Sequence, residues 1–376
     1  MTLLIKADAR FTPLKDESVH CVVTSPPYWG LRKYDAPELV WGGEAKCWHE
    51  WGEFERPGIS GGTASDKVRI KGKDNFQIVP PLQQGICRFC GAWRGQLGLE
   101  PTPELYVQHL VKIFREVHRV LKEGGTVWLN LGDSYTASPK GSLNGSDKSG
   151  LTSTRTQEHA PIGINKLVIG LKSKDLVGIP WLVAFALRND GWYLRSDIIW
   201  SKANPMPESV TDRPTRSHEY LFLLSKSQKY HYDADAIREP SGYRSKHGSG
   251  TGRPRFDEAQ MVTAPSGGVD AHPLGRNKRS VWTVATQPIP YAHFATFPEK
   301  LIEPCILAGC PQGGMVLDPF VGSGTTVRVA EKLNRRGIGL DLAYQEIGKV
   351  RTSRVQRRLK SLQEEFSRQV GTSAIE

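Results

Sequence analysis

Short apolar runs and longer amphipathic stretches alternate along most of the chain. Residues 3–5 and 21–23 are apolar and end in polar or proline-rich turns, which is typical of buried parallel strands. Between residues 103 and 122, apolar positions recur with helical spacing. Thr102 can cap this helix, and Gly124 with Gly125 is expected to end it.

The same alternation continues toward the C-terminus. Further strands are predicted at residues 126–130, 192–200, 219–224, 315–317 and 337–340, of which the second and third can pair as antiparallel neighbours. Further helices are predicted at residues 175–189, 325–333 and 344–369, and the last of these is highly charged. The pattern predicts an α/β fold, a doubly wound sheet with helices on both faces.

Two stretches, residues 134–174 and 241–280, break this pattern because they are rich in Gly, Ser, Lys and Arg. Loops this long in a compact enzyme are usually functional or disordered. Their basic character fits DNA-contacting segments that order on binding as well as it fits plain disorder.

Composition narrows the class of protein. The chain has 376 residues, of which 38% are hydrophobic, and a formal net charge of +11. These values suit one large α/β domain with an accessory lobe and exclude a disordered chain. The positive charge suits a polyanionic partner such as nucleic acid, although a basic surface kept for solubility gives the same total.

The chain carries no sign of export or membrane insertion. No apolar run approaches the roughly 20 residues that a membrane helix needs. The N-terminal residues lack the basic flank, long apolar stretch and cleavage site of a signal peptide. We therefore expect a cytoplasmic protein whose six cysteines are reduced, as free thiols or metal ligands.

A glycine-rich turn between a predicted strand and a predicted helix indicates a cofactor site. Gly322 and Gly324 allow the backbone to approach a ligand closely, and the N-terminus of the following helix offers N–H groups to an anion. No Lys-Ser or Lys-Thr pair follows the second glycine, which disfavours a phosphate-binding loop. The turn suits the methionine part of S-adenosylmethionine, with Asp318 on its ammonium group. Asp341 ends the next strand, where an acidic residue can bind ribose hydroxyls or cap a helix.

A second motif, Thr24-Ser25-Pro26-Pro27-Tyr28-Trp29, follows a predicted strand directly. Its two prolines fix φ and remove two N–H donors, which leaves a stiff segment with outward carbonyls. Such a segment can accept both hydrogens of an amino group, while Tyr28 stacks on a base. On its own, the motif favours a rigid turn with an aromatic packed beneath it.

Together, and in this order, the two motifs resemble the β-class amino-methyltransferases of DNA, a circularly permuted class in which the catalytic motif precedes the cofactor motif. The resemblance covers nearly the whole chain. It implies a Rossmann-like S-adenosylmethionine-dependent methyltransferase fold, with a mixed, mostly parallel sheet and an inserted lobe. It also implies double-stranded DNA as substrate, a flipped-out base and direct attack without a covalent intermediate. It further implies a prokaryotic or phage-encoded protein, and leaves a homodimer and a companion restriction endonuclease open.

The resemblance also assigns roles to residues of this chain. The catalytic residues it implies are Ser25, Pro26, Pro27 and Tyr28. The cofactor-binding residues it implies are Asp8, Ala9, Thr24, Phe294, Thr296, Asp318, Pro319, Phe320, Gly322, Ser323, Gly324, Thr325, Thr326, Asp341 and Leu342. The target-base pocket it implies contains Trp29, Trp200 and Lys202. Phosphate contacts are expected from basic residues after that pocket, namely Arg213, Arg216, Arg238, Arg244, Lys246, Arg253, Arg255, Arg276, Lys278 and Arg279.

The target base is the most open of these expectations. Serine at position 25, where related enzymes also carry Asp or Asn, resembles the cytosine-N4 branch and favours that target. Adenine N6 remains the alternative, and a DNA-binding protein with a decayed cofactor site is a third. Cytosine-C5 chemistry needs a thiolate beside a proline. The only such pair, Pro304-Cys305, falls in a predicted helix, where Cys305 is expected to pack.

Cys47, His49, Cys87 and Cys90 form a candidate metal site between the two motifs. A Cys-x-x-Cys pair is a good zinc knuckle, whereas the Cys-x-His pair is tighter than usual. A redox pair and four unrelated residues are the alternatives to a structural zinc.

These features predict the domain organisation. The methyltransferase catalytic domain is expected to comprise residues 1–40, 99–240 and 281–376. Residues 41–98 are expected to form an inserted zinc-binding lobe, and residues 241–280, together with the loop at 134–174, the target-recognition segments.

Overall fold

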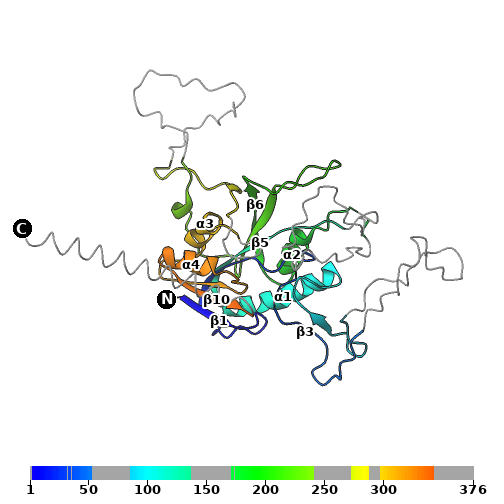
Figure 1. Ribbon diagram of the computed structural model, residues 1–376. Coiled ribbons are helices and arrows are strands. Elements are labelled where there is room, and N and C mark those ends of the chain that lie inside the picture. The colour runs from blue at the N-terminus through cyan, green and yellow to red at the C-terminus, as the bar shows by residue number, and fades with distance from the viewer. Residues whose placement is uncertain are drawn as a thin grey trace, which may run out of the picture.

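The computed structural model describes residues 2–31, 33–34, 36–52, 85–136, 171–172, 174–240, 272–287 and 297–342. Within these residues one large sheet has the strand order β1-β10-β9-β2-β5-β7-β6-β8 (Figure 1). In that order the strands are β1 (Thr2–Lys6), β10 (Arg336–Asp341), β9 (Met315–Asp318), β2 (Val19–Thr24), β5 (Leu121–Leu131), β7 (His218–Ser225), β6 (Tyr193–Lys202) and β8 (Val281–Val284).

The sheet is mixed and mostly parallel. The pairs β1–β10, β10–β9, β9–β2, β2–β5 and β6–β8 are parallel. Strand β7 runs antiparallel to both β5 and β6, as predicted for the two strands near residues 192–200 and 219–224. This Rossmann-like architecture confirms the predicted fold class.

Helices cover both faces of the sheet (Figure 1). They are α1 (Pro103–Val120), α2 (Ile179–Asn189), α3 (Glu299–Gly309) and α4 (Thr325–Lys332), with a short 3-10 turn at Asp235–Ile237. Buried side chains of α1 and α2 form one core with the sheet, and those of α3 and α4 form a second core on the opposite face. Described helices include none that is long and apolar enough to cross a membrane.

The sequence predicts the start of helix α1 correctly but not its end. The Thr102 hydroxyl accepts a hydrogen bond from the Leu105 N–H, which caps the helix as predicted. The helix stops at Val120, however, so the prediction that Gly124 and Gly125 end it was wrong. Both glycines lie within β5, where their carbonyls accept hydrogen bonds from the backbone of the segment after β7.

The helix α2 begins four residues later than the predicted residue 175. The Asp133 carboxylate, which follows β5, accepts hydrogen bonds from the N–H groups of Gly178 and Ile179. A side chain distant in sequence therefore sets the start of this helix, and Gly178 turns into it with a φ of 82°.

A second, two-stranded sheet lies in the insert. Strands β3 (Leu39–Trp41) and β4 (Trp93–Gly95) pair antiparallel beside α1 (Figure 1). The predicted helix at residues 344–369 and most of the two basic stretches lie outside the described residues. The predicted domain boundaries stay predictions.

Candidate active site

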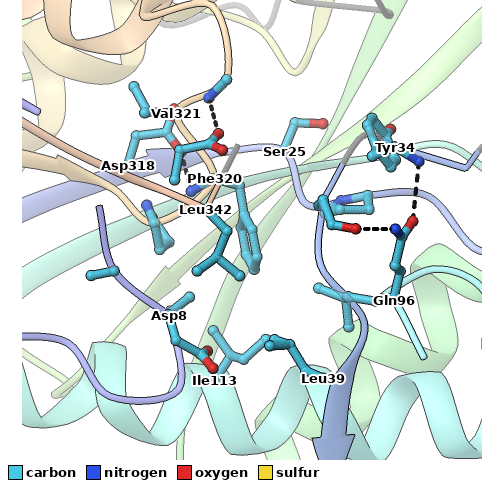
Figure 2. A pocket seen from close by; sticks show the side chains of 18 of the residues that line it. Asp8, Ser25, Tyr34, Leu39, Gln96, Ile113, Asp318, Phe320, Val321 and Leu342 are labelled. Atoms are coloured by element: carbon cyan, nitrogen blue, oxygen red, sulfur yellow. Dashed lines mark hydrogen bonds between the residues drawn. The ribbon is translucent and has the colours of Figure 1, made fainter. Parts of the chain in front are cut away.

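A pocket lies at the carboxyl ends of β1, β9, β10 and β2, which are parallel neighbours in the sheet. Ligands of open α/β sheets bind at this edge. Among the sequence-predicted residues that line the pocket are Asp8, Ala9, Ser25, Pro27, Asp318, Pro319, Phe320, Gly322, Ser323, Thr325, Asp341 and Leu342. Figure 2 shows the Phe320 ring in the middle, between the Asp318 turn on one side and Leu39 with Ile113 on the other.

Asp318 is the buried charge of this pocket. Its carboxylate accepts hydrogen bonds from the hydroxyls of Thr24 and Thr326, each at 2.6 Å, and from the Phe320 N–H at 3.0 Å. Burial raises the pKa of Asp318 to about 6, although these hydrogen bonds oppose the shift. The bond from Thr24 ties the end of β2, where the Pro-Pro motif begins, to the end of β9.

The glycine-rich turn has the conformation that its sequence requires. Gly322 and Gly324 have φ values of 45° and 80°, which strain any residue with a Cβ. The Gly322 N–H donates to Asp341 Oδ2 at 2.9 Å, so the carboxylate at the end of β10 fixes the turn that follows β9. Gly324 is the N-cap of α4, whose first turn faces the pocket through Thr325.

The polar groups of the Pro-Pro motif form a chain of hydrogen bonds. The Ser25 hydroxyl donates to the Tyr28 hydroxyl at 3.3 Å. The Tyr28 oxygen lies 2.7 Å from a carboxylate oxygen of Glu219 and 2.9 Å from the side-chain oxygen of Asn130. Lys202 Nζ contacts the other Glu219 oxygen at 2.6 Å. Burial, followed by the Glu219 charge, raises the pKa of Tyr28 well above its usual value, so its hydroxyl stays a donor.

Backbone groups of the Pro-Pro motif also form hydrogen bonds with neighbouring segments. The Tyr106 hydroxyl of α1 donates to the Pro27 carbonyl at 2.7 Å, and the Gly30 N–H donates to the Gly98 carbonyl at 2.8 Å. Pro26 is buried and Ser25 is half-buried. The segment is therefore stiff through its contacts as well as through its prolines.

Two tryptophans predicted for the target-base pocket are buried. Trp29 is 2% exposed, and its indole N–H donates to the Glu100 carbonyl within the core. Trp200 is 3% exposed, and its N–H donates to the Val284 carbonyl of β8. Lys202 Nζ lies over the Trp200 ring, 5.1 Å from its centroid, and belongs to the polar chain around Tyr28. The assignment of these three residues to a target-base pocket stays a prediction.

Other predicted residues support the pocket without lining it. Thr24 and Thr326 hold Asp318, and Gly324 starts α4. Phe294 and Thr296 lie outside the described residues. Cys305 is buried in α3, as expected for a packing residue.

Sequence reasoning missed several residues. Glu219 near the start of β7 and Asn130 near the end of β5 are polar residues beside buried apolar runs, which is a sequence signal for a functional role. The pocket also includes residues before and within the two ends of the insert, namely Tyr34, Ala36, Pro37, Leu39, Trp41, Gln96 and Leu97. Strands of three residues show no periodicity, so no sequence pattern pointed to these.

The structure brings the four candidate metal ligands together. One ligand atom from each of Cys47, His49, Cys87 and Cys90 lies within 4.8 Å of all the others. The Sγ atoms of Cys47 and Cys87 are 3.8 Å apart, and Cys90 Sγ is 3.4 Å from His49 Nδ1. Tetrahedral zinc with the usual bond lengths requires separations of about 3.8 Å and about 3.5 Å for these two pairs.

The basic residues predicted to contact phosphates, which follow β6 in the chain, mostly meet acidic partners where they are described. Glu239 contacts Arg276, Lys278 and Arg279 within 3.5 Å, which leaves this cluster positive. Arg213 pairs with Glu208. The remaining described members are Arg216 and Arg238, whereas Arg244, Lys246, Arg253 and Arg255 lie outside the described residues.

The chain is similar to known DNA methyltransferases along most of its length. A family model described as DNA methylase, of the N6/N4 type, matches residues 19–349. The chain is 39% identical over 355 residues to the Type II methyltransferase M.SmaI of Serratia marcescens, covering 93% of this chain and 90% of that protein. It is 40% identical over 329 residues to M.XycI of Xanthomonas campestris pv. cyanopsidis, covering 88% and 79%. In fold it is similar to the PvuII DNA methyltransferase (cytosine-N4-specific), with a TM-score of 0.52 at 14% identity, covering 95% and 90%.

Proposed function

The chain belongs to the N6/N4 family of DNA methylases, and from this premise we propose that it transfers the methyl group of S-adenosylmethionine to N4 of cytosine in double-stranded DNA. One observation carries the proposal. The 2.6 Å hydrogen bond from Thr24 to Asp318 joins the Pro-Pro motif to the glycine-rich turn, and Ser25 lines the same pocket as Asp318. A methyl donor in this pocket and an amino group at Ser25 would therefore be neighbours.

The pocket offers a partner to each part of S-adenosylmethionine. Asp318 is a buried carboxylate for the ammonium group, and the first turn of α4 suits the carboxylate. Asp341 suits the ribose hydroxyls, and the apolar surfaces of Phe320 and Leu342 suit the adenine. When bound, the cofactor supplies an electrophilic methyl group on its sulfonium.

Ser25 and the Pro26 carbonyl act on the target amino group. Because Ser25 donates its hydrogen to Tyr28, its lone pairs face an incoming N–H donor. Accepting both amino hydrogens raises electron density on the nitrogen and aligns its lone pair with the methyl group. The base leaves the duplex to reach this position.

Serine at position 25 supports cytosine N4 over adenine N6, which remains the second candidate. Cytosine-C5 chemistry is disfavoured because Cys305 is buried in α3, where burial raises the pKa of its thiol well above the usual value. Both relatives carry the name Type II methyltransferase, which supports a companion restriction endonuclease for this chain as well.

The proposal includes one structural zinc ion at Cys47, His49, Cys87 and Cys90. Its support is the match between two ligand separations in the structure, Cys47–Cys87 and His49–Cys90, and tetrahedral geometry. Protein purified without added zinc should carry stoichiometric metal, and Cys90→Ser should lose it. Phe89→Ala, in the same knuckle but without a ligand atom, should keep it. Metal-free wild-type protein would contradict the assignment.

Methyl transfer is tested with labelled S-adenosylmethionine and DNA, followed by digestion to nucleosides. Label should appear in N4-methylcytosine, whereas label in N6-methyladenine would overturn the choice of base. Ser25→Ala should lower kcat about a hundredfold, since one preorganised hydrogen bond to the reacting group is lost. Its cofactor Kd should stay within about twofold, because Ser25 carries no cofactor charge.

A further inference from the structure

The insert forms the second wall of the cofactor pocket. Leu39 and Trp41 of β3, together with Gln96 and Leu97 directly after β4, line it opposite the glycine-rich turn. Figure 2 shows Leu39 on the far side of Phe320 from Asp318, and Gln96 bonded to the backbone of the Tyr34 segment. This wall comes entirely from chain that flanks the four metal-ligand residues.

The wall is small by itself. Strands β3 and β4 have three residues each, with Leu39 opposite Gly95 and Trp41 opposite Trp93. The Trp41 indole N–H donates to the Gly95 carbonyl at 3.2 Å. A two-stranded ribbon of this length is marginal by itself in water, so its position depends on the burial of Trp41 and Trp93 against α1 and on what joins the chain at its open end.

The ligand cluster joins the two strands at their far end. Cys47 follows β3, and Cys90 precedes β4 by three residues. The Cys87 N–H donates to the Ala92 carbonyl at 2.7 Å, next to β4. On the other arm, a Cβ at Gly43 would lie 2.7 Å from Cys90 Sγ, so the chain leaving β3 touches the ligand of the opposite arm.

A metal ion here would also join two parts of the chain that are distant in sequence. The backbone leaves the cluster at Gly52 and returns at Gly85, where these two glycines are hydrogen-bonded. Each arm supplies two ligands, so one ion joins four positions at once. Bringing together two parts of the chain that are distant in sequence costs closure entropy, which metal–ligand bonds offset.

Movement of the wall would reach the rest of the pocket through stacked rings. The His109 ring of α1 stacks on Trp41 at 4.4 Å and lies 5.5 Å from Trp93. The Arg10 guanidinium also lies over the Trp41 ring, 4.3 Å from its centroid. The same guanidinium pairs with the Asp8 carboxylate at 2.6 Å. Asp8 lines the pocket, so both the apolar wall and this carboxylate depend on where Trp41 sits.

We infer that the metal site at Cys47, His49, Cys87 and Cys90 sets the cofactor affinity of the enzyme, because a bound zinc ion holds the β3–β4 ribbon in place as a wall of the cofactor pocket. The inference rests on the proposed function, since it takes S-adenosylmethionine to be the ligand of this pocket.

The test compares S-adenosylmethionine affinity by calorimetry in metal-loaded protein, chelator-treated protein and chelator-treated protein with zinc restored. If metal removal leaves the wall ordered in about a tenth of the molecules, the Kd for S-adenosylmethionine rises about tenfold. Adding zinc back restores the original Kd. Cys90→Ser should have the weak Kd from the start and not respond to chelator. Phe89→Ala should behave as wild type.

Hydrogen exchange on the same samples separates the outcomes. Metal removal should lower amide protection in β3 and β4, while β9 and β10 keep theirs. An unchanged Kd after verified metal removal overturns the inference, as does loss of protection throughout the large sheet, since the metal would then stabilise the whole domain. Metal-loaded protein that binds no S-adenosylmethionine contradicts the proposed function instead.

Discussion

The two walls of the cofactor pocket are built in different ways. The sheet wall, Asp318 to Thr325 with Asp341, consists of short turns between elements of the main fold and carries the buried charge. The insert wall, Tyr34 to Trp41 with Gln96 and Leu97, is mostly apolar and stands on a ribbon of three-residue strands. The sheet wall thus supplies the polar groups that recognise the ligand, and the insert wall supplies the apolar surface that covers it.

The difference implies different sensitivities. Changes in the sheet wall should remove specific charged contacts without moving the wall, because parallel strands hold it from both sides. Changes in the insert wall should act through its position, and therefore depend on the ligand cluster that joins its two strands.

The largest expected effect is Asp318→Asn in the sheet wall. Asparagine keeps the size of the side chain but removes the charge that we assign to the cofactor ammonium group. Leaving a buried charged partner unpaired costs about 3 kcal/mol, so the Kd for S-adenosylmethionine should rise roughly a hundredfold. Asp16→Asn, at an exposed carboxylate, is the control and should leave the Kd unchanged. Wild-type affinity in Asp318→Asn would remove the distinction between the walls.

Acid pH should weaken binding through the same residue. The pKa of Asp318 is raised to about 6, so the free protein takes up a proton as the pH falls below that value. The cofactor ammonium group favours the ionised carboxylate, and the Kd at pH 5 should be about tenfold weaker than at pH 7. The folding contribution has the opposite sign, because the folded state prefers protonated Asp318 and loses stability as the pH rises through 6. Calorimetry on wild type and Asp318→Asn checks this, since the variant should lack the pH dependence.

Leu39→Ala in the insert wall should have a smaller effect. Loss of apolar contact worth about 1 kcal/mol raises the cofactor Kd about fivefold. The effect should largely disappear in demetallated protein, where the wall is already displaced. Val40→Ala, on the neighbouring exposed position of the same strand, serves as the control. A Leu39→Ala effect that persists undiminished without metal would argue that the wall stands independently of the cluster.

The smallest effect on cofactor affinity is expected where neither wall is changed. Tyr106→Phe removes the hydroxyl that donates to the Pro27 carbonyl. One lost hydrogen bond of about 1 kcal/mol should lower kcat about fivefold by loosening the Pro-Pro motif, with the cofactor Kd unchanged. Tyr193→Phe, at an exposed position on β6, controls for the substitution itself. Steady-state kinetics with calorimetry would reveal a shift in Kd, which would place Tyr106 with the pocket walls.

The sheet wall could be predicted from the sequence because its signals are local. A strand, two glycines with positive φ and a helix follow one another within ten residues, so Asp318, Gly322 and Gly324 could be assigned without a fold. The antiparallel pairing of β6 with β7 was likewise predicted from two strand patterns that follow one another along the chain.

The rest depends on contacts between distant segments. Glu219 lies on β7, and only the sheet brings it to Tyr28 on the loop after β2. The indole N–H groups of Trp29 and Trp200 donate to backbone carbonyls of distant segments, and no local pattern reveals these contacts. The insert wall was missed because its lining residues flank a long insertion, whereas the four ligand residues inside it were recognisable from their chemistry.

A crystal structure with bound S-adenosylmethionine tests the assigned position of the cofactor most directly. We predict the ammonium group on Asp318, the ribose hydroxyls on Asp341, the adenine between Phe320 and Leu39, and the sulfonium methyl group facing Ser25. A cofactor bound outside this pocket, or reversed so that its methyl group points away from Ser25, would contradict it.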